Sequence, residues 1–66
     1  MKIELNGEAR DVENGQLLSE LVTALSLSNQ AIAVAVNRQI IVRSMWNEHV
    51  LKMNDKVDVV RAIGGG

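Results

Sequence analysis

The sequence contains no cysteine and no proline, and it has a single aromatic residue, Trp46. The absence of cysteine excludes disulfide bonds, thiolate metal sites and a cysteine nucleophile. The single histidine, His49, has no second histidine with which to share a metal ion, so we expect no metal site. Without proline, the turns must depend on Asn, Asp and Gly. Leu, Ile, Val and Ala must therefore build most of the core.

Charged residues of either sign do not cluster. Seven basic and eight acidic residues give a net charge of −1, and the two signs are interleaved. Nucleic-acid binding by counterion release needs grouped Lys and Arg, so we expect no nucleic-acid partner. No apolar run approaches the ~20 residues of a membrane span, and the first residues lack the layout of a signal peptide. We expect a cytoplasmic protein that is monomeric when free.

The 66 residues, 47% of them hydrophobic, are enough for one small globular domain. Residues 2–6 alternate polar and apolar side chains, as a half-buried strand does. Asn6-Gly7 follows and is a strong hairpin signal before a return strand over residues 8–13. A two-residue turn would place Arg10 opposite Ile3. A four-residue loop would place Val12 there, which matches the apolar faces better.

One amphipathic helix is predicted over about residues 16–25. Its apolar stripe has the i, i+3, i+4, i+7 spacing of a helix face and consists of Leu18, Leu21, Val22 and Leu25. Residues 31–36 then alternate alanine with β-branched residues, which predicts a central strand with one bulky and one small face. A tight turn at 37–39 leads to a short strand at 40–42.

The segment from 43 to 49 is mixed and polar. Met45 and Trp46 are its large apolar residues, and we expect them to plug the core. Trp46 could anchor a partner, because Trp is enriched in binding hot spots, but we favour a place in the core. The last strand covers residues 56–63, with Val57, Val59 and Ile63 on the inner face.

This order of elements predicts an α+β fold. A mixed sheet of four to five strands with one helix packed across one face satisfies the two-layer rule. The first and last strands can then lie side by side, parallel and central, which is the β-grasp topology of ubiquitin-like proteins. We expect residues 1–63 to form this domain and residues 64–66 to form a flexible glycine tail.

Gly64, Gly65 and Gly66 offer no side chain, so their only chemical handle is the carboxylate of Gly66. Activation by ATP as an acyl-adenylate would make this carboxylate an electrophile for sulfur or an amine. Residues without Cβ can enter a narrow active site and turn inside it, and three extended residues reach about 10 Å. We therefore expect this glycine tail to be delivered to another enzyme.

The chain resembles the ThiS family of sulfur carriers in bacterial thiamin biosynthesis. The resemblance spans the whole chain and rests on Ile3-Glu-Leu-Asn-Gly7, the leucine helix, Val34-Ala-Val-Asn37, Arg38-Gln-Ile-Ile-Val42, Trp46, the Asn54-Asp55 turn and the terminal Gly-Gly. One departure is Gly64, where a bulkier residue is often found.

The resemblance implies a cycle in which the carrier has no catalytic residue and binds no cofactor of its own. A ThiF-type adenylyltransferase uses ATP to adenylate Gly66. A cysteine desulfurase or a relay protein then supplies the sulfur of a thiocarboxylate, which thiazole synthase consumes. The alternatives are a sulfur carrier for molybdopterin synthesis, a ubiquitin-like protein modifier and a pure binding module.

A candidate partner-binding face lies on the last strand. Val60 and Ala62 have the parity opposite to Val57 and Val59. If the latter pair faces the helix, Val60 and Ala62 lie on the open face of the sheet, where an apolar patch often marks a binding site.

Overall fold

The structure is a computed structural model that describes residues 1–61. It contains strands β1 (Lys2–Leu5), β2 (Glu8–Asp11), β3 (Ile32–Val36), β4 (Gln39–Ile41) and β5 (Lys56–Arg61), helix α1 (Leu18–Ala24) and a short 3₁₀ helix, η1 (Arg43–Met45). The predictions for Ala62, Ile63 and the glycine tail concern residues outside this range.

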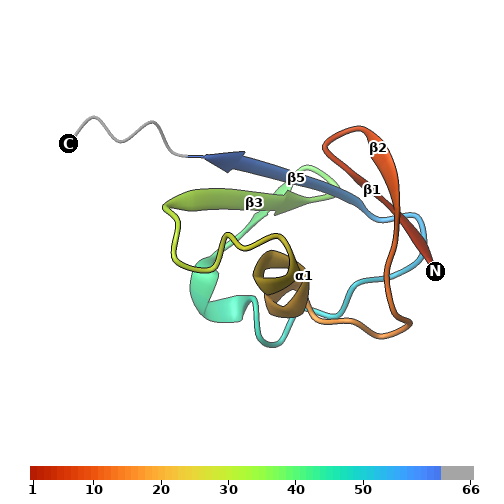
Figure 1. The fold of residues 1–66 in the computed structure, drawn as a ribbon, viewed down its shortest axis with the longest axis horizontal. Helices are drawn as coiled ribbons and strands as arrows, with labels where there is room; N and C mark the ends of the chain where they lie inside the picture. The colour runs from red at the N-terminus through yellow and green to blue at the C-terminus, as the bar shows by residue number, and fades with distance from the viewer. Residues whose placement is uncertain (62–66) are drawn as a thin grey trace.

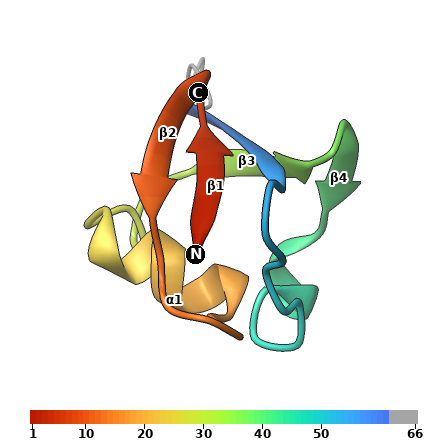
Figure 2. The same cartoon turned by 90° about the vertical axis from the view of Figure 1, so that its right-hand side faces the viewer.

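The five strands form one mixed sheet in the order β2-β1-β5-β3-β4. β1 and β5 are parallel, whereas the β1–β2, β3–β4 and β3–β5 pairs are antiparallel. α1 lies across one face of the sheet, and β3 and β5 run side by side above it (Figure 1). Viewed from the end, the sheet curves around the helix (Figure 2). The predicted β-grasp topology, with the first and last strands parallel and adjacent, is confirmed.

The register of the first hairpin, which the sequence left open, is that of the two-residue turn. Ile3 pairs with Arg10 and Leu5 with Glu8, so the loop has two residues. Asn6 and Gly7 have φ values of 50° and 84°, which is the left-handed pair that a type I′ turn requires. Turn geometry therefore set the register. Val12 reaches the core from beyond the strand end, where its N–H donates to the Met1 carbonyl at 2.8 Å.

Helix α1 is shorter than predicted, because the chain before it stays extended. Leu17 has φ −81° and ψ 150° and forms an isolated bridge with Val50, while the Leu51 N–H donates to the Gln16 carbonyl at 2.8 Å. The predicted stripe is confirmed: Leu18, Leu21 and Val22 are buried and Leu25 is half-buried.

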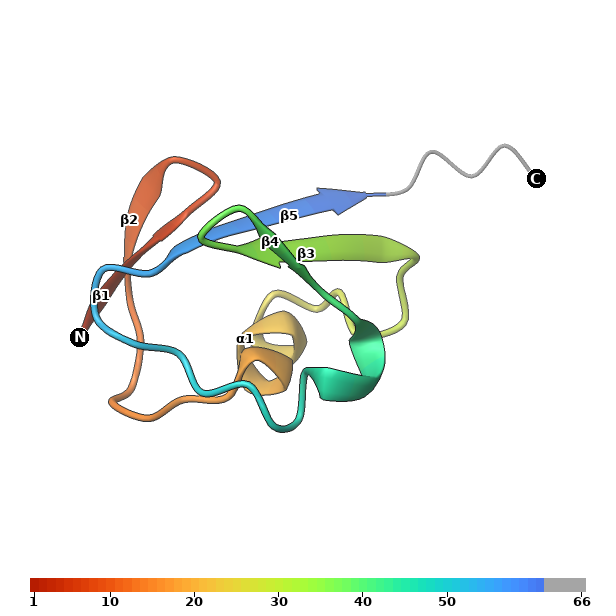
Figure 3. The same ribbon diagram turned by 180° about the vertical axis from the view of Figure 1, so that it is seen from behind.

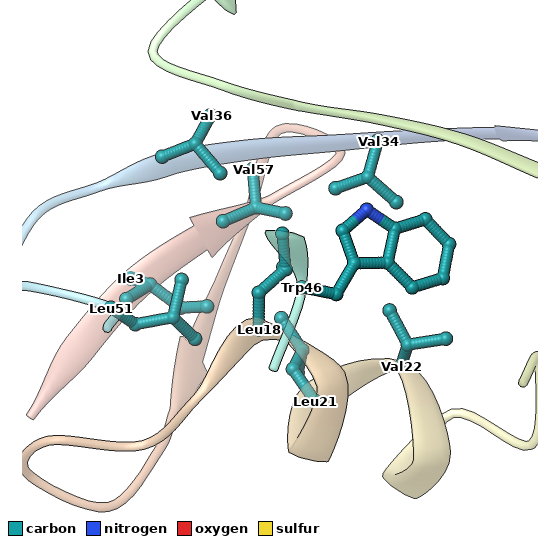
Figure 4. Close-up of a cluster of buried hydrophobic side chains, with 9 residues drawn as sticks. All are labelled: Ile3, Leu18, Leu21, Val22, Val34, Val36, Trp46, Leu51 and Val57. Carbon is teal, nitrogen blue, oxygen red and sulfur yellow. The ribbon is translucent and has the colours of Figure 1, made fainter. Parts of the chain in front are cut away.

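The core lies between the helix and the sheet (Figure 4). Its buried side chains are Ile3, Leu18, Leu21, Val22, Val34, Val36, Trp46, Leu51 and Val57. The Trp46 ring lies between Val34 and Val22, and its Nε1–H donates to the Ile41 carbonyl at 2.9 Å. Trp46 is only 5% exposed, so the core interpretation is confirmed, whereas Met45 is 47% exposed and is not a plug.

Candidate functional site

The central strand β5 leads toward the glycine tail, and the turns of both hairpins hold it in place. The Asn6 side chain accepts a hydrogen bond from the Val59 N–H at 2.8 Å, and the Asn37 Oδ1 accepts one from the Lys56 N–H at 3.0 Å. Both asparagines have positive φ, 50° and 53°. Asn tolerates this conformation and has a side chain that can reach a neighbouring backbone. Each turn residue thus closes its hairpin and fixes β5.

A buried carboxylate holds the start of β5. Asp55 is 8% exposed, and it is the buried polar residue among residues 1–61. Its Oδ1 accepts from the Asn37 side-chain amide at 3.0 Å, and its Oδ2 accepts from the Lys52 N–H at 2.8 Å. Its carbonyl accepts from the Glu4 N–H of β1 at 2.9 Å. One residue therefore ties together the turn before β5, β1 and the second hairpin.

The open face of the sheet carries the predicted Val60, which is 62% exposed and points away from the helix. Val57 on the opposite face is fully buried and Val59 is half-buried, so the predicted alternation is confirmed for these residues. Ala62, the other predicted member of this face, lies outside the described residues. The sequence analysis missed the neighbours that complete the surface.

Those neighbours come from β3 and β4. Ala33 lies directly opposite Val60, and Ala35 lies opposite Ile40, which is 66% exposed. Directly opposed residues share one sheet face. Val60, Ala33, Ala35 and Ile40 therefore form what we call the apolar strip, which crosses β5, β3 and β4 and is bordered on β5 by Asp58, directly opposite Ala35. β4 lies in front of β3 in the rear view (Figure 3).

The other end of the open face is charged. Lys56 pairs with Glu4 across β5 and β1, and the Lys2 ammonium lies 3.0 Å from the Asp11 carboxylate across β1 and β2. On the open face, the apolar strip therefore lies apart from the charged pairs of β1, β2 and the start of β5. Within residues 1–61, no group of three or more side chains is placed to hold a metal ion. No helix in this part is long and apolar enough to cross a membrane.

The mixed five-stranded sheet with one helix across it defines a small ubiquitin-like β-grasp protein. The sequence profile of the ThiS family matches residues 3–66. The chain belongs to the ThiS family.

Individual relatives agree with this assignment. The chain is 32% identical to the sulfur carrier protein ThiS of Escherichia coli over the full length of both chains. It is 38% identical over its whole length to a thiazole synthase of Magnetococcus marinus, but it spans only 20% of that protein. The crystal structure of the thiamine biosynthesis protein ThiS from Geobacter metallireducens superposes with a TM-score of 0.86, at 25% identity, and both chains are fully covered.

Proposed function

We propose that this chain is a sulfur carrier of thiamin biosynthesis and that its reactive group is the carboxylate of Gly66. The observation that carries the proposal is the full-length match to a protein named as a sulfur carrier, ThiS of Escherichia coli, in a chain whose sequence ends in three glycines. The chain has no cysteine, so it has no side-chain thiol that could hold sulfur as a persulfide.

The chemistry proceeds by activation and substitution. The Gly66 carboxylate attacks the α-phosphorus of ATP, which the activating enzyme binds, and pyrophosphate leaves. A persulfide sulfur then attacks the acyl-adenylate carbonyl, and AMP leaves. The resulting acyl disulfide is cleaved by a second thiol, which forms a disulfide with the donor cysteine and releases the thiocarboxylate. Because ATP and these thiols are needed, the proposal places the carrier in the cytoplasm.

Thiazole synthase is the proposed acceptor of the sulfur. A segment like this chain occupies part of a protein named thiazole synthase in Magnetococcus marinus, which supports a working relationship between the two. The activating enzyme and the cysteine desulfurase or relay protein follow from the chemistry. Gly64 and Gly65 have no Cβ, so they form a narrow stretch of backbone through which Gly66 can enter each active site.

Intact mass spectrometry tests the carrier role. After incubation with a ThiF-type enzyme, ATP and a sulfur source, the protein should gain the mass difference between sulfur and oxygen, and fragmentation should map it to Gly66. A variant without Gly65-Gly66 should keep the circular dichroism spectrum and show no gain. An unchanged mass in the full chain, or residues that remain beyond Gly66 in the purified native protein, would contradict the proposal.

The apolar strip, with Ala62, is the proposed docking face for the activating enzyme and thiazole synthase. Val60→Asp places a charge in this strip and should weaken binding to either enzyme at least tenfold, or about 1.4 kcal/mol. Met53→Asp is a matched control, because Met53 is 65% exposed, close to the value for Val60, and belongs to the turn before β5. Equal binding of the two variants in titration calorimetry would refute the docking face.

A further inference from the structure

The sequence contains two Asn-Gly pairs, Asn6-Gly7 and Asn14-Gly15. In such a pair the backbone nitrogen of the glycine can attack the side-chain carbonyl carbon of the asparagine and close a succinimide ring. Glycine favours this attack because it has no Cβ to obstruct it and its backbone is free to turn. Every other asparagine of the chain is followed by a residue with a side chain. The two pairs are therefore the places where the side-chain amide can be lost spontaneously.

The fold restrains Asn6 through both its backbone and its side chain. Its N–H donates to the Val57 carbonyl at 2.9 Å, and its Oδ1 accepts the Val59 N–H at 2.8 Å. Its φ of 50° belongs to the tight turn that joins β1 to β2. Ring closure rotates the asparagine side chain and backbone together, so Asn6 must first give up the bond to Val59 and leave this turn conformation. Such an opening of a paired hairpin is rare in a folded domain.

Asn14 lies in the exposed loop between β2 and α1, where no strand restrains it. The Gln16 N–H donates to the Glu13 carbonyl at 3.2 Å, and the Glu13 N–H donates to the Gln16 side-chain oxygen at 3.1 Å. These bonds join the residues on either side of the pair and leave the asparagine itself aside. No hydrogen bond within residues 1–61 uses the Asn14 side chain. Its amide is therefore free to rotate toward the Gly15 nitrogen.

We propose that Asn14 is a site of spontaneous deamidation in the folded protein and that the fold protects Asn6. The Gly15 nitrogen bonds to the Asn14 side-chain carbonyl carbon, the bond from that carbon to Nδ2 breaks, and the amide leaves as ammonia with the proton of the Gly15 N–H. Water then opens the succinimide at either carbonyl. Opening at the side-chain carbonyl gives aspartate, and opening at the backbone carbonyl gives isoaspartate. No oxidant or reductant is consumed.

Hydrogen bonding, rather than exposure, separates the two pairs. Asn6 and Asn14 are both exposed, so water reaches either side chain. The difference is that ring closure at Asn14 requires movement of a loop, whereas ring closure at Asn6 requires the loss of bonds to the central strand β5. We expect Asn14 to react at least tenfold faster than Asn6, which corresponds to about 1.4 kcal/mol.

The modification changes the charge of a defined part of the surface. It replaces a neutral amide with a carboxylate beside Glu13, so the net charge of −1 becomes more negative by one. The loop between β2 and α1 lies at the opposite end of the molecule from the end of β5 (Figures 1 and 3). The modified form should therefore still be activated at Gly66, an expectation that rests on the proposed function. The modification itself does not depend on that function.

Peptide mapping of the aged, full-length protein tests the site. After incubation at mildly alkaline pH, trypsin cleaves at Arg10 and separates the two pairs, and mass spectrometry measures the fraction of each that has changed from amide to acid. The folded protein should accumulate the acid at Asn14 and keep the amide at Asn6. The same chain incubated in urea is the matched control, and there both pairs should convert at similar rates. The Asn14→Gln variant should lose the folded-state signal, because glutamine would have to close a larger ring.

Two results would overturn the proposal. The first is conversion of Asn6 in the folded protein as fast as that of Asn14, which would show that the bonds to β5 give no protection. The second is an Asn14 that stays intact in the folded protein but converts in urea, which would show that the bonds between Glu13 and Gln16 hold the loop rigid. The assay contains no enzyme, ATP or sulfur source, so its outcome is independent of the carrier role.

Discussion

Replacing Asp55 by alanine should destabilise the domain more than any other single removal of a carboxylate from residues 1–61. The Asp55 carboxylate accepts hydrogen bonds from the Asn37 amide at 3.0 Å and from the Lys52 N–H at 2.8 Å, and it is 8% exposed. A buried donor left without a partner costs about 1–3 kcal/mol. The Asn37 side-chain amide can rotate toward water, whereas the Lys52 N–H belongs to the backbone and cannot, so the Lys52 N–H should account for most of the cost.

We therefore expect the free energy of unfolding to fall by about 2–3 kcal/mol in Asp55→Ala. A domain of this size has a total stability of roughly 3–10 kcal/mol, so the loss is a large share of it. Near the melting temperature, each kcal/mol corresponds to about 4–8 °C in a small domain. The melting temperature should thus fall by roughly 10–20 °C. Asp55→Asn keeps one acceptor oxygen and should lose about half as much.

Urea unfolding followed by circular dichroism measures this loss directly. Asp58→Ala is the control, because Asp58 lies three residues further along in β5, is exposed and faces the open side of the sheet. It should change stability by less than about 0.5 kcal/mol. If Asp55→Ala unfolds at the same urea concentration as Asp58→Ala, the buried carboxylate does not hold the start of β5 and the reasoning is wrong.

Three further substitutions test other contacts by the same unfolding measurement. Trp46→Phe loses the hydrogen bond to the Ile41 carbonyl and should cost about 1–2 kcal/mol; wild-type stability would show that this bond contributes nothing. Asn6→Gly keeps the turn conformation but removes the acceptor for the Val59 N–H, and should cost about 1 kcal/mol; no loss would show that the turn alone matters. Arg38→Gly relieves a left-handed residue with a φ of 70° and should stabilise the domain by up to about 1 kcal/mol; a loss of stability would contradict the assigned strain.

The topology could be predicted because several local patterns in the sequence agree with one another. The helix stripe, the alternation in residues 31–36 and the parity of Val57, Val59 and Val60 each depend on near neighbours, and the structure confirms them. The register of the first hairpin stayed open in the sequence analysis because two local signals disagreed. The Asn6-Gly7 turn prevailed because Val12 can pack against the core without belonging to the paired strand.

The contacts that position β5 could not be predicted from spacing. Asn37 and Asp55 are 18 residues apart, and each is also a good turn residue, so the pattern gave no reason to pair them. The apolar strip needed the strand order as well. Ala33, Ala35 and Ile40 share one surface with Val60 only because β3 lies between β5 and β4. The face to which a side chain points can be predicted from one strand, whereas the residues that form a surface can be predicted only from the order of several strands.

The parallel pairing of β1 and β5 also has a mechanical consequence. A force that pulls the start of β1 and the end of β5 in opposite directions acts along both strands, so their hydrogen bonds are loaded in shear and must fail together. The Asn6 N–H to Val57 carbonyl bond, at 2.9 Å, is one of these bonds, and the five pairs between β3 and β5 share the load. A partner that draws in the chain beyond Arg61 therefore pulls on a strand that is paired on both sides, and the domain should stay folded under that load.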